Sequence, residues 1–290
     1  MRRNVENWTV DDILRMTEQS ITYAKKHNLR VIYITEDTTR THPALLEKLY
    51  LTAASCGADW INICDTVGHV TPDGIYALIQ FIRNSLNENG YQHVHIDFHG
   101  HMDRGLGLWN SIAALAAGAK RVQACALGIG ERCGNTPMEQ LLVNLKLMRW
   151  LEGDLKNLTA YVEQVAKAFH IEIPSSSPVV GENAFLTATG VHAAAIAKAS
   201  EKKQYDLAEN IYSSVPASWI GRENEIKIGP LSGKWNVIYW FKKNNIPYTD
   251  AMINILLAEA KRVDKIMTDK QILTFIKNYY QRSEHENFIV

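Results

Sequence analysis

The sequence has no excess of charge of either sign, few cysteines and no long apolar run. Its 290 residues include 31 basic and 31 acidic side chains, a balance that does not favour binding to nucleic acid or to a membrane surface. No uninterrupted apolar stretch approaches the roughly 18 residues that a membrane-spanning helix needs. The four cysteines show no C-x-x-C spacing, so we expect reduced thiols in or near the core of a cytoplasmic protein.

Short β-rich runs alternate with helical patterns through the first half of the chain. Their regular recurrence is what a parallel sheet with helical crossovers requires, so we predict an α/β fold. The predicted strands cover residues 30–35, 60–64, 94–98 and 121–127, and the predicted helices cover residues 9–27, 43–56, 73–86, 106–117 and 138–150.

The four predicted strands all end in polar or charged residues, among them Glu36, Asp65, His99 and Glu131. In β/α barrels the catalytic groups lie at these carboxyl ends of the strands. An open doubly wound sheet would show the same alternation, but its G-x-G-x-x-G turn is missing after the first strand. The pattern therefore favours a β/α barrel.

The pattern changes after Trp150. A helix is expected over residues 155–169, a linker over residues 173–178, and two or three helices at the end of the chain. We therefore predict a barrel domain over residues 1–151 and a mostly α-helical region over residues 152–290.

The most informative short motif is His99-Gly100-His101, at the end of an alternating run. Residues two apart in a strand share a face, so both imidazoles can converge on one cation. A polar stripe facing a partly solvated interior would alternate in the same way. On this motif alone both interpretations stay open.

A second motif changes that balance. His99-Gly100-His101-Met102-Asp103 is followed by Gly128-Ile129-Gly130-Glu131-Arg132-Cys133-Gly134-Asn135. The pairing resembles the 2-isopropylmalate synthase and homocitrate synthase family, the DRE-TIM acyltransferases, whose motifs read roughly H-x-H-N-D and G-x-G-E-R-x-G-N. The segments at residues 36–37, 65–68, 181–185 and 190–192 also match in order and spacing.

The resemblance implies a TIM (β/α)8 barrel and a metal-dependent, Claisen-type condensation of acetyl-CoA with a 2-oxo acid. His99, His101 and Asn135 would then be ligands of a divalent ion, Zn²⁺, Mn²⁺ or Mg²⁺. The ion would polarise the carbonyl of the oxo acid as a Lewis acid.

The resemblance also assigns roles to residues around the ion. Glu36 and Thr66 match positions that contact the oxo acid, and Glu131 matches a carboxylate of the active site. His192 and Tyr212 match residues that reach into the barrel of the partner subunit and assist proton transfer, which implies a homodimer.

A purely structural explanation stays open for several of these residues. Asp65 or Glu36 can cap a helix at a strand end, and Asn135 can be the N-cap of the helix that follows it. His192 can be a packed helix histidine, and Glu131 can form a weak surface ion pair with Arg132.

One departure from the family pattern is large. The family's first strand carries an Asp-Arg-Glu-like segment with a metal ligand and an oxyanion-stabilising arginine, and no such segment precedes Glu36. We therefore expect only the last four βα units of the barrel, in a truncated or split form. A separate chain would then supply the N-terminal half, or two copies would close one hybrid barrel, and the isolated chain should be inactive.

Two other functions remain open. The first is a metal-dependent carbon–carbon lyase or aldolase on the same fold, against which the motif from Glu131 to Asn135 argues. The second is a non-catalytic assembly subunit, which would co-purify with a companion chain.

Overall fold

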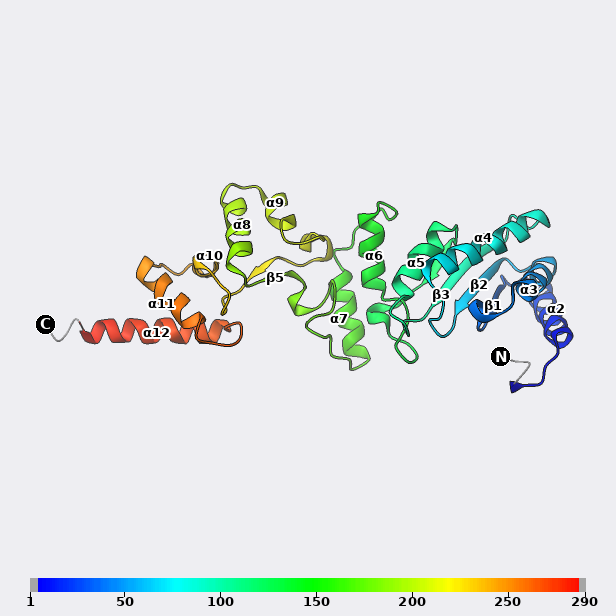
Figure 1. The fold of residues 1–290 in the computed structure, drawn as a ribbon, viewed down its shortest axis with the longest axis horizontal. Coiled ribbons are helices and arrows are strands. Elements are labelled where there is room, and N and C mark those ends of the chain that lie inside the picture. The colour runs from blue at the N-terminus through cyan, green and yellow to red at the C-terminus, as the bar shows by residue number, and fades with distance from the viewer. Residues whose placement is uncertain (1–4, 287–290) are drawn as a thin grey trace. The chain divides into compact units, whose positions relative to one another are not determined.

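The computed structural model describes the backbone of residues 5–286 and the side chains of residues 5–281. The chain forms two compact units, of which the first ends at Glu152 and the second begins at Gly153. In Figure 1 the first unit runs from blue to green and the second from green to red.

A four-stranded parallel sheet organises the first unit, with its strands side by side in the order β1-β2-β3-β4. This confirms the predicted α/β class. In a doubly wound sheet the strand order reverses at a switch point, and no reversal occurs among these strands. The strands are β1 (Ile32–Thr35), β2 (Trp60–Asp65), β3 (His95–Gly100) and β4 (Arg121–Gln123).

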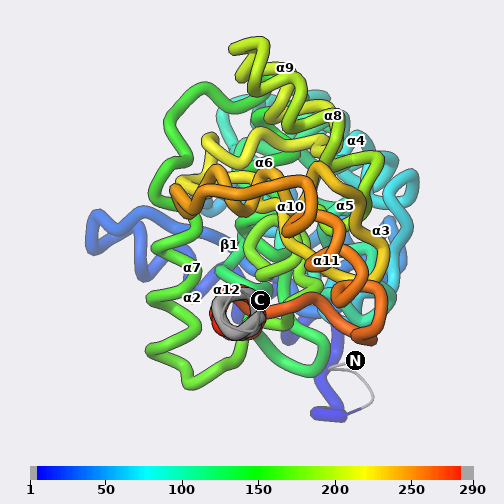
Figure 2. The backbone as a smooth tube through the Cα atoms, turned by 90° about the vertical axis from the view of Figure 1, so that its left-hand side faces the viewer, coloured from blue at the N-terminus to red at the C-terminus, as the bar shows by residue number. Residues whose placement is uncertain are grey.

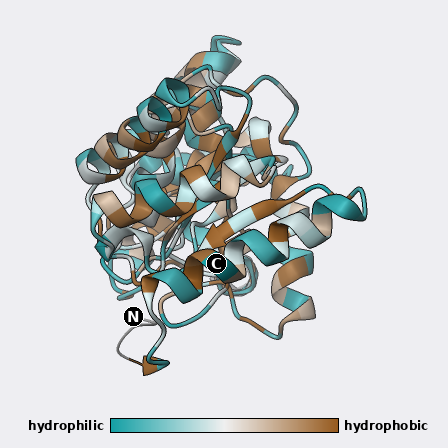
Figure 3. Cartoon of the chain, turned by 90° about the vertical axis from the view of Figure 1, so that its right-hand side faces the viewer, coloured by the Kyte–Doolittle hydropathy of each residue, from teal (hydrophilic) through white to brown (hydrophobic). Residues whose placement is uncertain are grey.

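One face of the sheet packs against helices and forms the core of this unit. Ile61, Ile63, Ile96 and Phe98 point to this face and are fully buried, together with Tyr50 from α3. Figure 3 shows the helices banded with hydrophilic and hydrophobic segments, as expected for helices with one face on a core. The helices are α2 (Val10–Lys26), α3 (Pro43–Ser55), α4 (Pro72–Glu88), α5 (Gly107–Ala116) and α6 (Met138–Leu147).

The opposite face of the sheet is mixed in polarity. The register pairs Asn62 with Asp97 and Cys64 with His99, so these four side chains share this face. On the edge strand β1, Ile34 shares it too and is 59% exposed. This face is therefore only partly covered by the described residues.

The first helix begins as its sequence predicts. The hydroxyl of Thr9 accepts the backbone N–H of Asp12, whose carboxylate in turn accepts from the backbone N–H of Thr9. The hydroxyl of Thr9 also donates to the Asp12 carboxylate at 2.6 Å, and this bond, together with the one from the Thr9 N–H, lowers the pKa of Asp12 to about 2.

The fourth strand is shorter than predicted. It ends at Gln123 rather than Leu127, and a 3₁₀ turn, η2 (Ala126–Gly128), follows. Leu127 adopts a left-handed backbone with φ 57°, and its N–H donates to the buried carboxylate of Glu139 at 2.9 Å. Because a side chain from outside the strand accepts this N–H, the segment does not continue the sheet. Alternation of residue types within the strand does not predict this contact.

The second unit is mostly helical, as predicted. Its helices α10, α11 and α12 enclose an apolar core that includes Trp240 and Phe241, and Figure 2 shows α8 and α9 side by side. The elements are α7 (Leu158–Ala168), β5 (Leu186–Thr187), α8 (Gly190–Glu201), α9 (Tyr205–Asn210), β6 (Glu225–Ile226), α10 (Lys234–Lys243), α11 (Asp250–Ala260) and α12 (Asp269–Glu286). Within the described residues, no helix combines the length and the apolar character needed to cross a membrane.

The buried carboxyl of Glu139 predicts a pH-dependent stability. Burial raises the pKa of Glu139 above its usual value of about 4.5. The unfolded chain thus releases this proton at lower pH than the folded protein does. The contribution of Glu139 to the free energy of unfolding is therefore fully present below about pH 4.5, and it is lost as the pH rises through the pKa of the folded protein. Glu139→Gln keeps an acceptor for Leu127 and should increase the free energy of unfolding at neutral pH.

Urea unfolding at about pH 4 and about pH 7 measures this effect. The advantage of Glu139→Gln should shrink at the lower pH, and Glu18→Gln, at an exposed position of α2, serves as the control. A Glu139→Gln protein that is no more stable than the wild type at about pH 7 contradicts the prediction.

Candidate metal centre

The two histidines of the short motif meet at the carboxyl end of β3. The Nε2 atoms of His99 and His101 are 3.1 Å apart. Their ring centroids are 4.9 Å apart, and the rings are nearly perpendicular at 88°. His99 is half-buried and His101 is 7% exposed, so the structure brings both rings to one sheltered point.

The separation of these nitrogens fits a shared divalent ion. Two nitrogens that each lie about 2 Å from one ion are about 2.9 to 3.4 Å apart at octahedral or tetrahedral angles. Burial, together with the neighbouring His101, lowers the pKa of His99. The neutral ring that this favours is the form that binds metals.

Asn135 lies next to this pair. It faces His101 across an isolated antiparallel bridge, and its Nδ2 donates to the carbonyl oxygen of Ile129 at 2.9 Å. Its Oδ1 is buried and, like the Nδ1 atoms of both histidines, has no hydrogen-bond partner within the described part of the chain. Buried polar atoms without partners are rare away from functional sites.

Gly130 leaves the space that the Asn135 amide occupies. A Cβ atom on Gly130 would lie 2.4 Å from Nδ2 of Asn135, so any larger residue at 130 would displace the amide. Helix α6 begins at Met138 with Pro137 in the capping position. The interpretation of Asn135 as a helix N-cap is therefore wrong.

The loop after β2 depends on Asp65, which is fully buried. Its Oδ1 accepts from Thr39 Oγ1 at 2.8 Å and from the N–H groups of His69 and Val70 at 2.9 and 3.3 Å. Asp65 is thus a loop anchor, and α4 is capped by Thr71 instead.

The predicted substrate contacts lie at the ends of β1 and β2. The hydroxyl oxygen of Thr66 accepts the N–H of Asp37 at 2.8 Å. Glu36 is exposed. Burial, together with the charge of Glu36, raises the pKa of Cys64 to about 11. Cys64 lies beside His99 on the same face of the sheet.

The predicted catalytic residues fall in two places. The side chain of Glu131 is 83% exposed and forms an ion pair with Arg132 at 3.5 Å. His192 and Tyr212 both belong to the second unit, where their rings stack with centroids 3.8 Å apart. Cys133, expected in or near the core, is exposed instead because it lies on the loop surface.

One contact between the loops is not predictable from the sequence motifs. The guanidinium of Arg132 donates to both carboxylate oxygens of Asp103, at 2.7 and 3.1 Å. It also donates to the carbonyl oxygen of Thr66 at 2.6 Å. The only signal in the sequence is that Asp103 and Arg132, one in each motif, carry opposite charges.

The first unit of this chain matches a known protein family. Residues 1–165 match the model of the HMGL-like family. The chain belongs to the HMGL-like family. Among solved structures, a hydroxymethylglutaryl-CoA lyase from Pseudomonas aeruginosa matches 59% of this chain and 59% of its own, with a TM-score of 0.51 and 19% identity, which shows a shared fold.

Relatives of this HMGL-like protein include proteins named as synthases. Homocitrate synthase AksA of Methanocaldococcus jannaschii is 32% identical over 275 residues, covering 93% of this chain and 64% of the relative. The 2-isopropylmalate synthase of the same organism is 32% identical over 226 residues, covering 77% of this chain and 40% of the relative. The chain thus spans less than two thirds of the length of these relatives.

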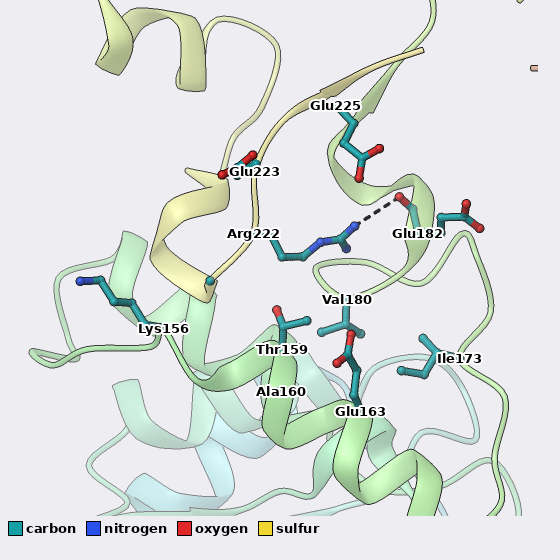
Figure 4. Close-up of a pocket in the computed structure, with 11 residues that line it drawn as sticks. Lys156, Thr159, Ala160, Glu163, Ile173, Val180, Glu182, Arg222, Glu223 and Glu225 are labelled. Atoms are coloured by element: carbon teal, nitrogen blue, oxygen red, sulfur yellow. Dashed lines mark hydrogen bonds between the residues drawn. The ribbon is translucent and has the colours of Figure 1, made fainter. Parts of the chain in front are cut away.

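A cavity elsewhere in this HMGL-like chain does not coincide with the predicted site. It has a volume of about 600 Å³ and lies within the second unit, between α7 and the segments around Glu182 and Arg222. Figure 4 shows Arg222 directed at the backbone oxygen of Glu182, to which it donates at 3.4 Å. None of the lining residues is a predicted site residue.

Removal of the Asp65 carboxylate should destabilise the first unit. Asp65→Ala leaves the N–H groups of His69 and Val70 and the hydroxyl of Thr39 without their acceptor. An unsatisfied buried polar group costs about 1–3 kcal/mol, so we expect a loss of roughly 3 kcal/mol in the free energy of unfolding.

Urea denaturation gives this loss directly. Asp73→Ala, at an exposed position in the first turn of α4, is the matched control and should cost less than about 1 kcal/mol. If both alanine variants unfold at the same urea concentration, Asp65 does not anchor the loop.

Proposed function

We propose that this chain forms the metal-binding and oxo-acid-binding part of an enzyme that condenses acetyl-CoA with a 2-oxo acid. The observation that carries the proposal is the 3.1 Å pair of imidazole nitrogens beside the buried amide oxygen of Asn135, which has no hydrogen-bond partner among the described residues. The relatives named as homocitrate and 2-isopropylmalate synthases support a Claisen-type acyl transfer.

His99, His101 and Asn135 would hold a divalent ion, Zn²⁺, Mn²⁺ or Mg²⁺. When bound, such an ion supplies Lewis-acid polarisation of the keto group. Among the described residues, no group of three or more His, Cys, Asp and Glu side chains is placed to hold a metal. Two imidazoles and one amide leave coordination positions open for the oxygens of the oxo acid and for a carboxylate from outside these residues.

The neighbouring residues would bind the oxo acid. Because Thr66 Oγ1 already accepts the N–H of Asp37, its own proton is available for donation to the substrate carboxylate. Burial, together with the charge of Glu36, raises the pKa of Cys64 and favours its neutral thiol in the metal-free chain. Glu36 and Glu131 would flank the mouth of this site.

The stacked His192 and Tyr212 would serve proton transfer. In the condensation the methyl group of acetyl-CoA loses a proton, its carbon bonds to the keto carbon, and the resulting alkoxide gains a proton. Hydrolysis of the thioester then releases the thiol of coenzyme A. We propose that the His192–Tyr212 pair approaches the site of a partner subunit, which makes the enzyme a homodimer.

The open face of the sheet would be the interior of a (β/α)8 barrel to which this chain contributes the last four βα units. The consecutive strand order and the helices on one face support this interpretation. So do Ile32 and Ile34, which are 41% and 59% exposed. Further βα units, on the same polypeptide or on a separate chain, would cover them. These units would also meet the oxygens of Asn62 and Asp97 that have no partner within the described part of the chain.

Metal binding tests the central claim. The full chain should bind one divalent ion, and alanine at His99 or His101 should weaken binding more than about 100-fold, beyond the usual cost of losing an outer-shell partner. Titration calorimetry with Zn²⁺ and Mn²⁺ gives the affinities. The exposed His93→Ala is the matched control, and metal affinity that survives replacement of both histidines refutes the site.

Thiol release tests the reaction. The protein should be purified with its native partners and sized by intact-mass analysis, then assayed with acetyl-CoA and oxoisovalerate, oxoglutarate or pyruvate. We expect thiol release that needs both an oxo acid and a metal, and His192→Asn should lower kcat at least about 100-fold without changing metal affinity. Cleavage of a carbon–carbon bond without oxo-acid-dependent thiol release would instead identify a lyase.

A further inference from the structure

One chain of contacts links the loops at the carboxyl ends of all four strands. Asp37, after β1, donates its N–H to the hydroxyl of Thr66, after β2, at 2.8 Å. The carbonyl of Thr66 accepts a hydrogen bond from Arg132 at 2.6 Å. Arg132 also donates to the carboxylate of Asp103, which follows β3. Arg132 thus joins its own loop to the loops after β2 and β3.

The same contacts lie next to the proposed metal ligands. Asp103 comes two residues after His101, and Arg132 comes three residues before Asn135. Between them, the N–H of Met102 donates to the carbonyl of Gly134 at 2.9 Å. A shift of the Arg132 guanidinium would therefore move the ligand-bearing loops relative to each other.

The backbones of the loops after β2 and β3 are in close contact. A Cβ atom on Gly68 would lie 2.9 Å from both the carbonyl oxygen of His101 and the backbone nitrogen of Asp103. Arg132 itself has a left-handed backbone with φ 55°, a conformation that is unfavourable for a residue with a Cβ. Such strain persists only where the surrounding contacts over-determine it.

We infer that Arg132 is a positioning residue, which fixes His101, Asn135 and Thr66 relative to one another for metal and oxo-acid binding. This inference rests on the proposed function. An isolated exposed ion pair would contribute little, but here one planar guanidinium spans a carboxylate and a carbonyl of two different loops. A lysine has a single ammonium group and cannot reproduce that geometry.

The experiment compares the metal affinity of Arg132→Met and Arg132→Lys with that of the unaltered chain of residues 1–290, by calorimetric titration with Zn²⁺. We expect Arg132→Met to bind the ion about 10- to 100-fold more weakly, the usual effect of losing a partner that orients ligands. Arg132→Lys should lie between the two. The spectrum of bound Co²⁺ should change in both variants.

Arg104→Met is the matched control. Arg104 follows Asp103 directly, but among the described residues it donates to the carbonyl of His69, at 2.6 Å, rather than to the 128–135 loop. Its loss should leave the metal affinity unchanged. Asp103→Leu added to Arg132→Met should cause little further loss, because both changes break the same contact.

The outcomes separate this inference from the proposed function. If Arg132→Met lowers the unfolding midpoint of the metal-free protein but binds Zn²⁺ as tightly as the wild type, Arg132 is only structural and the inference is overturned. Metal binding by the wild type would still uphold the site. If the wild type binds no divalent ion, the proposed function fails and the inference fails with it.

Discussion

The parallel pairing of β2 with β3 is the constraint on which the candidate site depends. Its register sets Cys64 beside His99 and Asp65 beside Gly100, so the loops that follow both strands leave the same edge of the sheet. A shift of one residue would turn His99 toward the helices and Phe98 toward the opposite face. The burial of Phe98 in the core thus helps to hold His99 on the site face.

The elements could be predicted from the sequence because their signals are local. Alternation within β3 and the paired motifs were enough to place His99, His101 and Asn135 at one edge of a parallel sheet. The end of β4 and the role of Arg132 could not be predicted, because both are decided by contacts between distant residues. Glu139 captures the N–H of Leu127 from twelve residues away, and Arg132 bonds Asp103 across 29 positions.

The two faces of the sheet impose different requirements on the same strands. The face toward the helices is filled by large apolar side chains and stabilises the unit. The other face carries Asn62 and Asp97, each with a buried oxygen that lacks a partner within the described residues. Leaving such acceptors unpaired costs stability, so this face is suited to binding further polar groups rather than to holding the fold together.

The loop that carries Asn135 combines strain with charged anchors. Leu127, Arg132 and Gly134 all have positive φ. Two ionisable side chains hold the loop: Glu139 accepts the N–H of Leu127 at its start, and Arg132 donates to Asp103 from its middle. A loop built this way has few alternative conformations, since each anchor fixes a backbone direction that the chain would otherwise avoid. The amide of Asn135 is therefore placed before any ligand arrives, and less ordering entropy has to be lost when an ion binds.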